Sequence, residues 1–183
     1  MRSRRQPGER DYVDQMLDDW ALERPDLDLS PLGVIGRISR VSRRFDREIS
    51  KVFHAFGLSS WGFYVLAALN RAGPPYQLTP TELYRSLLVS SGLMTSRIVR
   101  LEQAGLVRRV PDPADGRSVL VALTDEGREL VNIAIEHHNR NEAAMLSPLT
   151  EEERRLVAAS LRKLLIASGD VPRGTGTGRT EGP

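Results

Sequence analysis

The side chains best suited to chemistry in this chain are arginines and hydroxyl residues between residues 85 and 117. Six arginines fall in this segment against three acids, although the whole chain has a formal net charge of only +2. The arginines are Arg85, Arg97, Arg100, Arg108, Arg109 and Arg117. Guanidinium groups bind phosphate and guanine through paired hydrogen bonds. The composition therefore indicates a nucleic-acid contact, with a solvated basic face as the alternative.

The order of elements predicted around these arginines favours the first interpretation. A serine begins a predicted helix over 91–104, which ends at Gly105. Two runs of branched apolar residues, 106–110 and 118–123, predict strands, and the turn between them is rich in proline and aspartate. A helix followed by a hairpin is typical of a winged helix-turn-helix, whose helix enters the major groove of DNA and whose wing reaches the minor groove.

The predicted helix has two different faces. Met94, Ile98 and Leu101 share one face and are expected in the core. Hydroxyl and guanidinium groups elsewhere can contact bases and phosphates, and a wing arginine held by an aspartate can enter the minor groove. The predicted DNA-binding residues are Ser90, Ser91, Thr95, Ser96, Arg97, Arg100, Asp115 and Arg117. Helix capping alone would also explain the two first serines, and solvation would explain the wing arginine.

Further helices must hold this unit in place. The spacing of apolar residues and the capping signals predict helices over 10–23, 31–56, 60–71, 80–87, 124–146 and 151–167. A threonine and a glutamate three residues later form capping boxes at Thr79 and at Thr150. The expected fold is mostly α with a small β-hairpin wing (α+β), a winged helix-turn-helix with long N- and C-terminal dimerisation helices.

The helix over 31–56 carries an apolar residue every three or four positions for seven turns. A single winged domain cannot easily bury such a stripe, so a homodimer with two reading helices about one DNA turn apart is expected. Packing within one chain is the alternative.

The predicted organisation is a disordered stretch 1–9, a helix and linker 10–30, a main domain 31–168 and a disordered tail 169–183. The winged unit spans about 58–124, between dimerisation helices 31–56 and 125–168.

Enzyme chemistry has little support in the sequence. The chain has no cysteine and three histidines, of which His137 and His138 are neighbours on a helix and face different directions. It contains no H-E-x-x-H motif, phosphate loop or nucleophile elbow. We therefore expect no catalytic site, metal or cofactor. Because no secretory signal and no apolar run of about 18 residues is found, we expect a cytoplasmic protein without membrane contact.

Several segments together resemble the MarR family of dimeric winged-helix transcription regulators. They are LTPTEL (78–83), SSGLMTSRIVRLEQAGLVRR (90–109), DPADGRSVLVALTDEG (112–127) and the leucine-rich final helix. The likeness covers about residues 31–168. The family wing usually reads D-x-R-R or D-R-R, whereas this chain has Asp115-Gly116-Arg117 and lacks one wing arginine.

The N-terminal segment resembles the urate-responsive branch of that family, which has an extra N-terminal helix. This likeness implies a ligand site formed by Trp20, Arg97 and Arg109, in which relatives also use an aspartate. Tyr64 stands at the aspartate position. A phenol is neutral at pH 7 and cannot hold an arginine as a carboxylate does, so a different aromatic or phenolic ligand, or loss of the response, is expected. A plain hydrophobic anchor is the alternative role of Trp20.

The prediction from the whole chain is a sequence-specific DNA-binding transcription regulator. It would act as a homodimeric repressor on a pseudo-palindromic operator of double-stranded DNA, and a small aromatic, purine or other anionic ligand would release it. A winged-helix module that acts on another regulator without binding DNA specifically is one alternative. An enzyme with a pocket at Trp20 and Arg97 is the other, and it lacks a nucleophile or a metal constellation.

Overall fold

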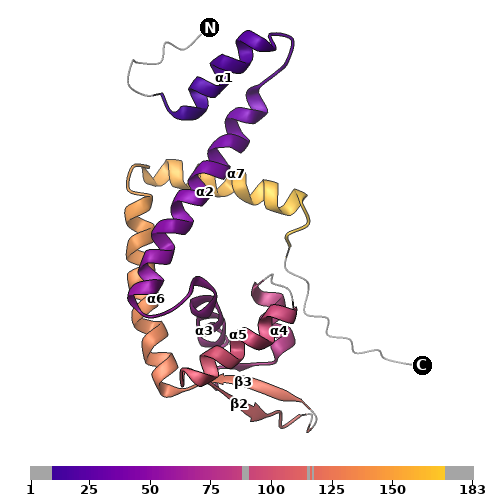
Figure 1. Cartoon of the computed structure of the whole chain (residues 1–183), viewed down its shortest axis with the longest axis vertical. Helices are drawn as coiled ribbons and strands as arrows, with labels where there is room; N and C mark the ends of the chain where they lie inside the picture. The colour runs from indigo at the N-terminus through magenta and orange to yellow at the C-terminus, as the bar shows by residue number, and fades with distance from the viewer. Residues whose placement is uncertain (1–9, 88–90, 115, 117, 172–183) are drawn as a thin grey trace, which may run out of the picture. The chain divides into compact units, whose positions relative to one another are not determined.

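The computed structural model describes residues 10–87, 91–114, 116 and 118–171. Within these ranges the chain forms seven helices and one three-stranded antiparallel sheet (Figure 1), which confirms the predicted fold class. It divides into two compact units after Glu142, and each is described by itself. The first unit contains α1 to α5, the sheet and most of α6, and the second contains α7.

The helices are α1 (Tyr12–Glu23), α2 (Ser30–Ala55), α3 (Ser60–Arg71), α4 (Pro80–Leu87), α5 (Ser91–Gln103), α6 (Asp125–Met145) and α7 (Glu151–Ala167). The strands are β1 (Gln77–Leu78), β2 (Val107–Pro111) and β3 (Val119–Leu123). Every predicted helix and strand is present, with its ends within two residues of the expected ones. The strand β1 was not predicted, because two residues are too short to show an alternating pattern.

Side-chain hydrogen bonds cap several of the helices. The hydroxyl of Ser59 accepts a hydrogen bond from the backbone N–H of Gly62 at 3.0 Å. Thr79 and Glu82 form the predicted capping box, in which each side chain accepts from the other residue's backbone N–H. Thr124 precedes α6 rather than beginning it, and its hydroxyl accepts from the N–H of Gly127. These bonds satisfy N–H groups that have no partner inside the helix.

The core of the first unit lies around α3. Val65, Leu66 and Leu69 of α3 are fully buried. The buried side chains around them come from α2, α4, α5, the sheet and α6, namely Phe53, Leu83, Ile98, Leu101, Val107, Val121, Leu123, Val131 and Ala134. The sheet order is β1-β3-β2, and the central strand β3 has four buried residues in a row. The core thus fixes α5 and the hairpin to the same scaffold.

The helix α1 packs on the first half of α2. Two glycines of α2, Gly33 and Gly36, leave room there for the side chains of Leu17, Val13 and Met16. The guanidinium of Arg37 then joins the two helices through ion pairs with Asp11 and Asp14.

No single described helix is long and apolar enough to cross a lipid bilayer by itself. The helices α2 and α3, which meet at a bend of 75°, reach that length and composition only as a pair.

Candidate DNA interface and ligand site

The helix α5 has the two faces that the sequence predicts. Ile98 and Leu101 are only 3% and 6% exposed and belong to the core. Thr95, Ser96 and Arg100 are exposed on the rest of the helix. The core therefore holds one face of α5 while Thr95, Ser96 and Arg100 face the solvent, as a recognition helix requires. The side chain of Met94, the third expected core residue, lies outside the described part.

The predicted wing is an antiparallel pair of strands. Five residues of β2 pair with β3, from Val107 opposite Leu123 to Pro111 opposite Val119. Beyond the strands, the N–H of Asp112 donates to the carbonyl of Ser118 at 3.1 Å, so the hairpin continues toward its tip. Asp115 and Arg117, the predicted wing contacts, lie outside the described residues. So does Ser90, and of Ser91 only its place at the start of α5 is described.

Arg97 is predicted both as a DNA contact and as a ligand contact. Its guanidinium carbon is 4.9 Å from the ring centroid of Trp61 at the start of α3. The indole Nε1 of Trp61 is buried and has no hydrogen-bond partner among the described residues. The predicted ligand residues include Trp20 and do not include Trp61. The available signal was the position of Trp61 directly after the Ser59-Ser60 cap.

Arg109 of β2 points back to α5. Its Nε is 3.3 Å from a carboxylate oxygen of Glu102, and both side chains are partly exposed. Beside them lies a small cavity of about 70 Å³, lined by residues of α4, α5 and both wing strands, including Thr95 and Arg109. The structure thus brings one predicted ligand residue next to one predicted DNA contact. The cavity is too small for an aromatic ligand as it stands.

Tyr64 belongs to an aromatic cluster between α2 and α3. Its ring meets those of Phe53 and Phe63 edge-on, with centroids 5.7 and 5.6 Å away. Burial, and then the negative charges of Asp46 and Glu142, raise the pKa of the phenol above its ordinary value. Tyr64 is therefore neutral at pH 7, and it cannot form the ion pair that an aspartate at this position would form.

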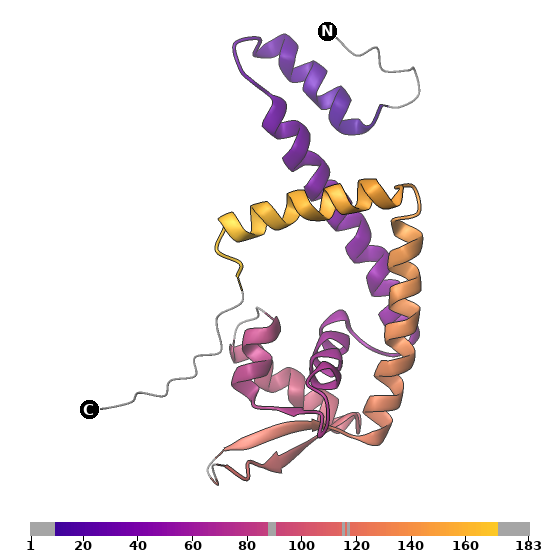
Figure 2. The ribbon, with the colours of Figure 1, turned by 180° about the vertical axis from the view of Figure 1, so that it is seen from behind.

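The remaining predicted ligand residue, Trp20, is not brought to the others within one chain. It lies on α1 and is 48% exposed. The helix α1 packs at Gly33 and Gly36 of α2, whereas Tyr64 packs at Phe53. Seventeen residues of helix separate Gly36 from Phe53, a distance of about 25 Å at the α-helical rise. Both views show α1 at the opposite end of α2 from α3 (Figures 1 and 2).

Among the described residues, no group of three or more histidines, cysteines or carboxylates is arranged to hold a metal ion. The carboxylates near the candidate site are used in ion pairs or helix caps, as with Glu102 and Glu82. The arrangement offers hydrogen-bond donors, cationic groups and aromatic faces, which can bind but do not form a nucleophile and base pair.

Comparison with known proteins agrees with this geometry. The family model described as MarR family matches residues 56–118, from the end of α2 to the wing. The regulator PecS of Dickeya dadantii (strain 3937) is 45% identical over 152 residues, which are 83% of this chain and 92% of PecS. PecS is an HTH-type transcriptional regulator.

Solved structures show the same fold. A MarR variant from E. coli in complex with operator DNA has a TM-score of 0.66 and 28% identity, over 76% of this chain and 99% of that one. BpsR of Bordetella bronchiseptica, whose DNA binding is regulated by 6-hydroxynicotinic acid, has a TM-score of 0.64 and 26% identity. That match covers 72% of this chain and 91% of BpsR. These relatives are regulators and not enzymes, in agreement with the prediction for this chain. The chain belongs to the MarR family of DNA-binding transcriptional regulators.

Proposed function

We propose that this regulator is a homodimeric repressor that binds a pseudo-palindromic operator and leaves it when a small aromatic or anionic ligand binds. The observation that carries the DNA contact is the exposed polar face of α5, with Thr95, Ser96 and Arg100, backed by the buried Ile98 and Leu101. The wing strands β2 and β3 share the same core. Arg117 and Asp115 at the tip of the wing are also proposed DNA contacts.

Exposed apolar side chains support the homodimer. On α2, Val34, Ile35, Ile38 and Val41 are each at least 38% exposed. On α7, the exposed apolar side chains are Leu156, Val157, Leu161, Leu164, Leu165 and Ile166. Removing such apolar surfaces from water favours association. We therefore propose that both helices pack against a second copy, and sedimentation should give twice the chain mass.

The proposed ligand site lies around Arg97 and Tyr64. The ring of Trp61 under Arg97, and the aromatic cluster around Tyr64, suit a flat ligand with a negative charge. Regulation of the relative BpsR by 6-hydroxynicotinic acid supports the same ligand class. Arg109 is a further proposed contact, released from Glu102 when ligand binds. Trp20 is also a proposed contact. Because it lies far from Tyr64 within one chain, we propose that the Trp20 of this site comes from the second copy in the dimer.

The DNA proposal is tested by fluorescence anisotropy with labelled duplexes from the upstream region of the chain's own gene. We expect salt-sensitive binding that favours one pseudo-palindromic duplex over shuffled duplexes. Arg100→Ala should weaken binding by about ten-fold or more, and Arg162→Ala, an exposed arginine of α7, should not. Equal affinity for all duplexes would contradict the proposal and would favour a module that acts on another regulator.

The ligand proposal is tested by thermal shift with urate, other purines and phenolic acids. A ligand at 100 times its Kd stabilises the folded protein by about 2.7 kcal/mol. We expect an aromatic acid to raise the melting temperature of the parent, and urate to do so only in Tyr64→Asp. A parent that responds to urate as strongly as Tyr64→Asp would show that Tyr64 does not select the ligand.

With operator DNA as its partner, the protein is proposed to act in the cytoplasm.

A further inference from the structure

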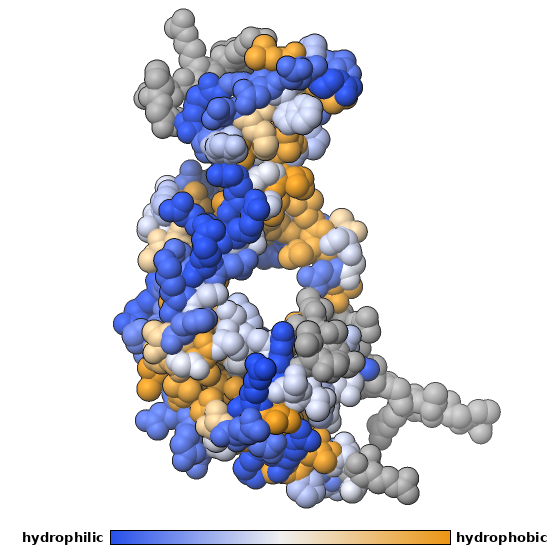
Figure 3. Space-filling view, in the orientation of Figure 1, coloured by the Kyte–Doolittle hydropathy of each residue, from blue (hydrophilic) through white to orange (hydrophobic). Residues whose placement is uncertain are grey.

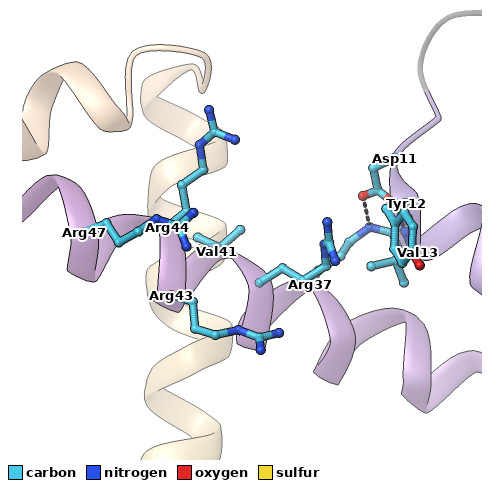
Figure 4. A pocket seen from close by; sticks show the side chains of 9 residues that line it. Asp11, Tyr12, Val13, Arg37, Val41, Arg43, Arg44 and Arg47 are labelled. Atoms are coloured by element: carbon cyan, nitrogen blue, oxygen red, sulfur yellow. Dashed lines mark hydrogen bonds and ion pairs between the residues drawn. The ribbon is translucent and has the colours of Figure 1, made fainter.

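A groove between α1 and the middle of α2 is used by neither the proposed DNA contacts nor the proposed ligand contacts (Figure 4). Its volume is about 450 Å³, within the usual range for small-molecule sites. Five arginines of α2 line it, namely Arg37, Arg40, Arg43, Arg44 and Arg47. Hydrophilic side chains also gather over α2 on the face shown in Figure 3. The chemistry of this groove is therefore cationic.

One of the five arginines has a structural role. The guanidinium of Arg37 lies 2.8 Å from Asp11 and 2.9 Å from Asp14, and its Nη1 donates to the carbonyl of Gly33. Asp14 is 7% exposed, so this pair is well shielded from solvent on one side. Arg37 thus holds α1 against α2 and forms one wall of the groove, and its charge is already balanced.

The other four arginines make no ion pair with any described residue. Arg40 lies 4.5 Å from the ring centroid of Tyr12, and Arg43 donates to the carbonyl of Ser39. The acids nearest in sequence to Arg44 and Arg47 are Asp46 and Glu48. Glu48 pairs with Lys51 at 2.9 Å, and the charges of Arg44 and Arg47 also help to lower its pKa. Four arginines without a close ion pair among the described residues therefore line the groove.

Such an arrangement is unfavourable for the helix itself. Arg40 and Arg44, and likewise Arg43 and Arg47, are four residues apart, and like charges at this spacing destabilise a helix. An anion in the groove would remove this repulsion. Guanidinium groups bind phosphate with two parallel hydrogen bonds each. The ring of Tyr12, which is 60% exposed, offers an aromatic surface at the edge of the same groove.

We propose that this groove binds a small anion with two or more phosphate groups, of the class of nucleoside polyphosphates and short polyphosphates. The site is separate from the residues of the proposed operator and aromatic-ligand contacts. A concave groove of this volume suits a small molecule better than duplex DNA, whose phosphates follow a broad convex surface. Closure by α1 on one side also makes the groove deeper than a flat basic patch.

The test is isothermal titration of the full-length protein with sodium tripolyphosphate, and separately with ATP, at constant ionic strength. We expect saturable binding of one anion per chain. Arg44→Gln combined with Arg47→Gln should weaken it by about ten-fold or more, because two charge-assisted contacts are lost. The matched control, Arg162→Gln with Lys163→Gln on α7, removes the same charge and should bind as the parent does.

The groove variant should fold, since it removes repulsion, and circular dichroism checks this directly. If it does not fold, Arg43→Gln alone replaces it, with Arg162→Gln as control. If ATP binds more tightly than tripolyphosphate, the groove also contacts the aromatic base. If the two bind equally, the groove recognises the phosphate groups alone. The proposal is overturned by three results: no saturable binding, equal loss in the control, or arginine-dependent binding of random duplex DNA without tripolyphosphate binding.

Discussion

Replacing Gly127 by alanine tests the packing of α6 on the segment that joins α5 to β2. Gly127 lies in the first turn of α6, where a Cβ would sit 2.0 Å from the carbonyl oxygen of Leu106 and 2.9 Å from its carbonyl carbon. Ordinary contact needs about 3.5 Å, so backbone must move by roughly 1 Å or more. No flexible side chain can absorb this shift, because the obstacle is the backbone between α5 and β2.

The cost follows from the bonds at this junction. The Thr124 hydroxyl donates to Gly105 at 2.7 Å and accepts from Gly127 at 3.0 Å, and the Thr124 N–H donates to Leu106 at 3.2 Å. Losing one or two of these bonds costs about 1 kcal/mol each. The forced backbone shift adds about 1–3 kcal/mol. A total near 3 kcal/mol corresponds to a melting temperature lower by about 6–12 °C.

The measurement is thermal and urea unfolding at one fixed protein concentration, with Gly33→Ala as the matched control. Gly33 is also a helical glycine, but its Cβ would meet Leu17 and Arg37 at an ordinary 3.5 Å. Alanine there should be neutral or should stabilise by up to about 1 kcal/mol, because alanine favours a helix. Equal stability of Gly127→Ala and the parent would refute the close packing of α6 on the wing junction.

Three further predictions concern caps and ion pairs. Thr150→Ala removes the capping box of α7 and should cost about 1 kcal/mol in urea unfolding, whereas Ser160→Ala in mid-helix should be nearly neutral. Hydrogen bonds from the Thr150 backbone and hydroxyl lower the pKa of Glu153. The stability that Glu153 contributes is therefore complete above its unfolded pKa of about 4.3 and is lost as the pH falls through its folded pKa. The melting temperature should therefore fall more steeply between pH 6 and 3 in the parent than in Glu153→Gln. Arg37→Gln should loosen α1 and increase proteolysis there without changing the melting of the core, and an unchanged cleavage rate would contradict that role.

Local signals account for the elements that sequence reasoning predicted well. The hydroxyl–glutamate pairs at Thr79 and Thr150 form capping boxes in the structure, because a cap depends on residues only three positions apart. The faces of α5 were predicted from spacing, and Ile98 and Leu101 are buried as expected. The two residues of β1 gave no such signal, since their pairing with β3 involves residues more than 40 positions away.

The candidate ligand site shows where local information ends. The family likeness selected Trp20, Tyr64, Arg97 and Arg109 from their neighbours in sequence. The structure instead places Arg97 over Trp61, at 4.9 Å, and leaves Trp20 on α1. Which aromatic ring lies under an arginine depends on how two helices cross, and that crossing is decided by the whole core.

The amino-acid sequence by itself determined every element except β1, the capping boxes and the family, because each rests on spacing and on residues close together in the chain. It also determined the polar face of α5 and the apolar stripe of α2. Only the tertiary structure decided that Gly127 must lack a side chain and that Trp61 supports Arg97. It also decided that the arginines of α2 face a groove closed by α1. These features arise where segments distant in sequence approach within a few ångströms, and the packing of the core fixes that approach.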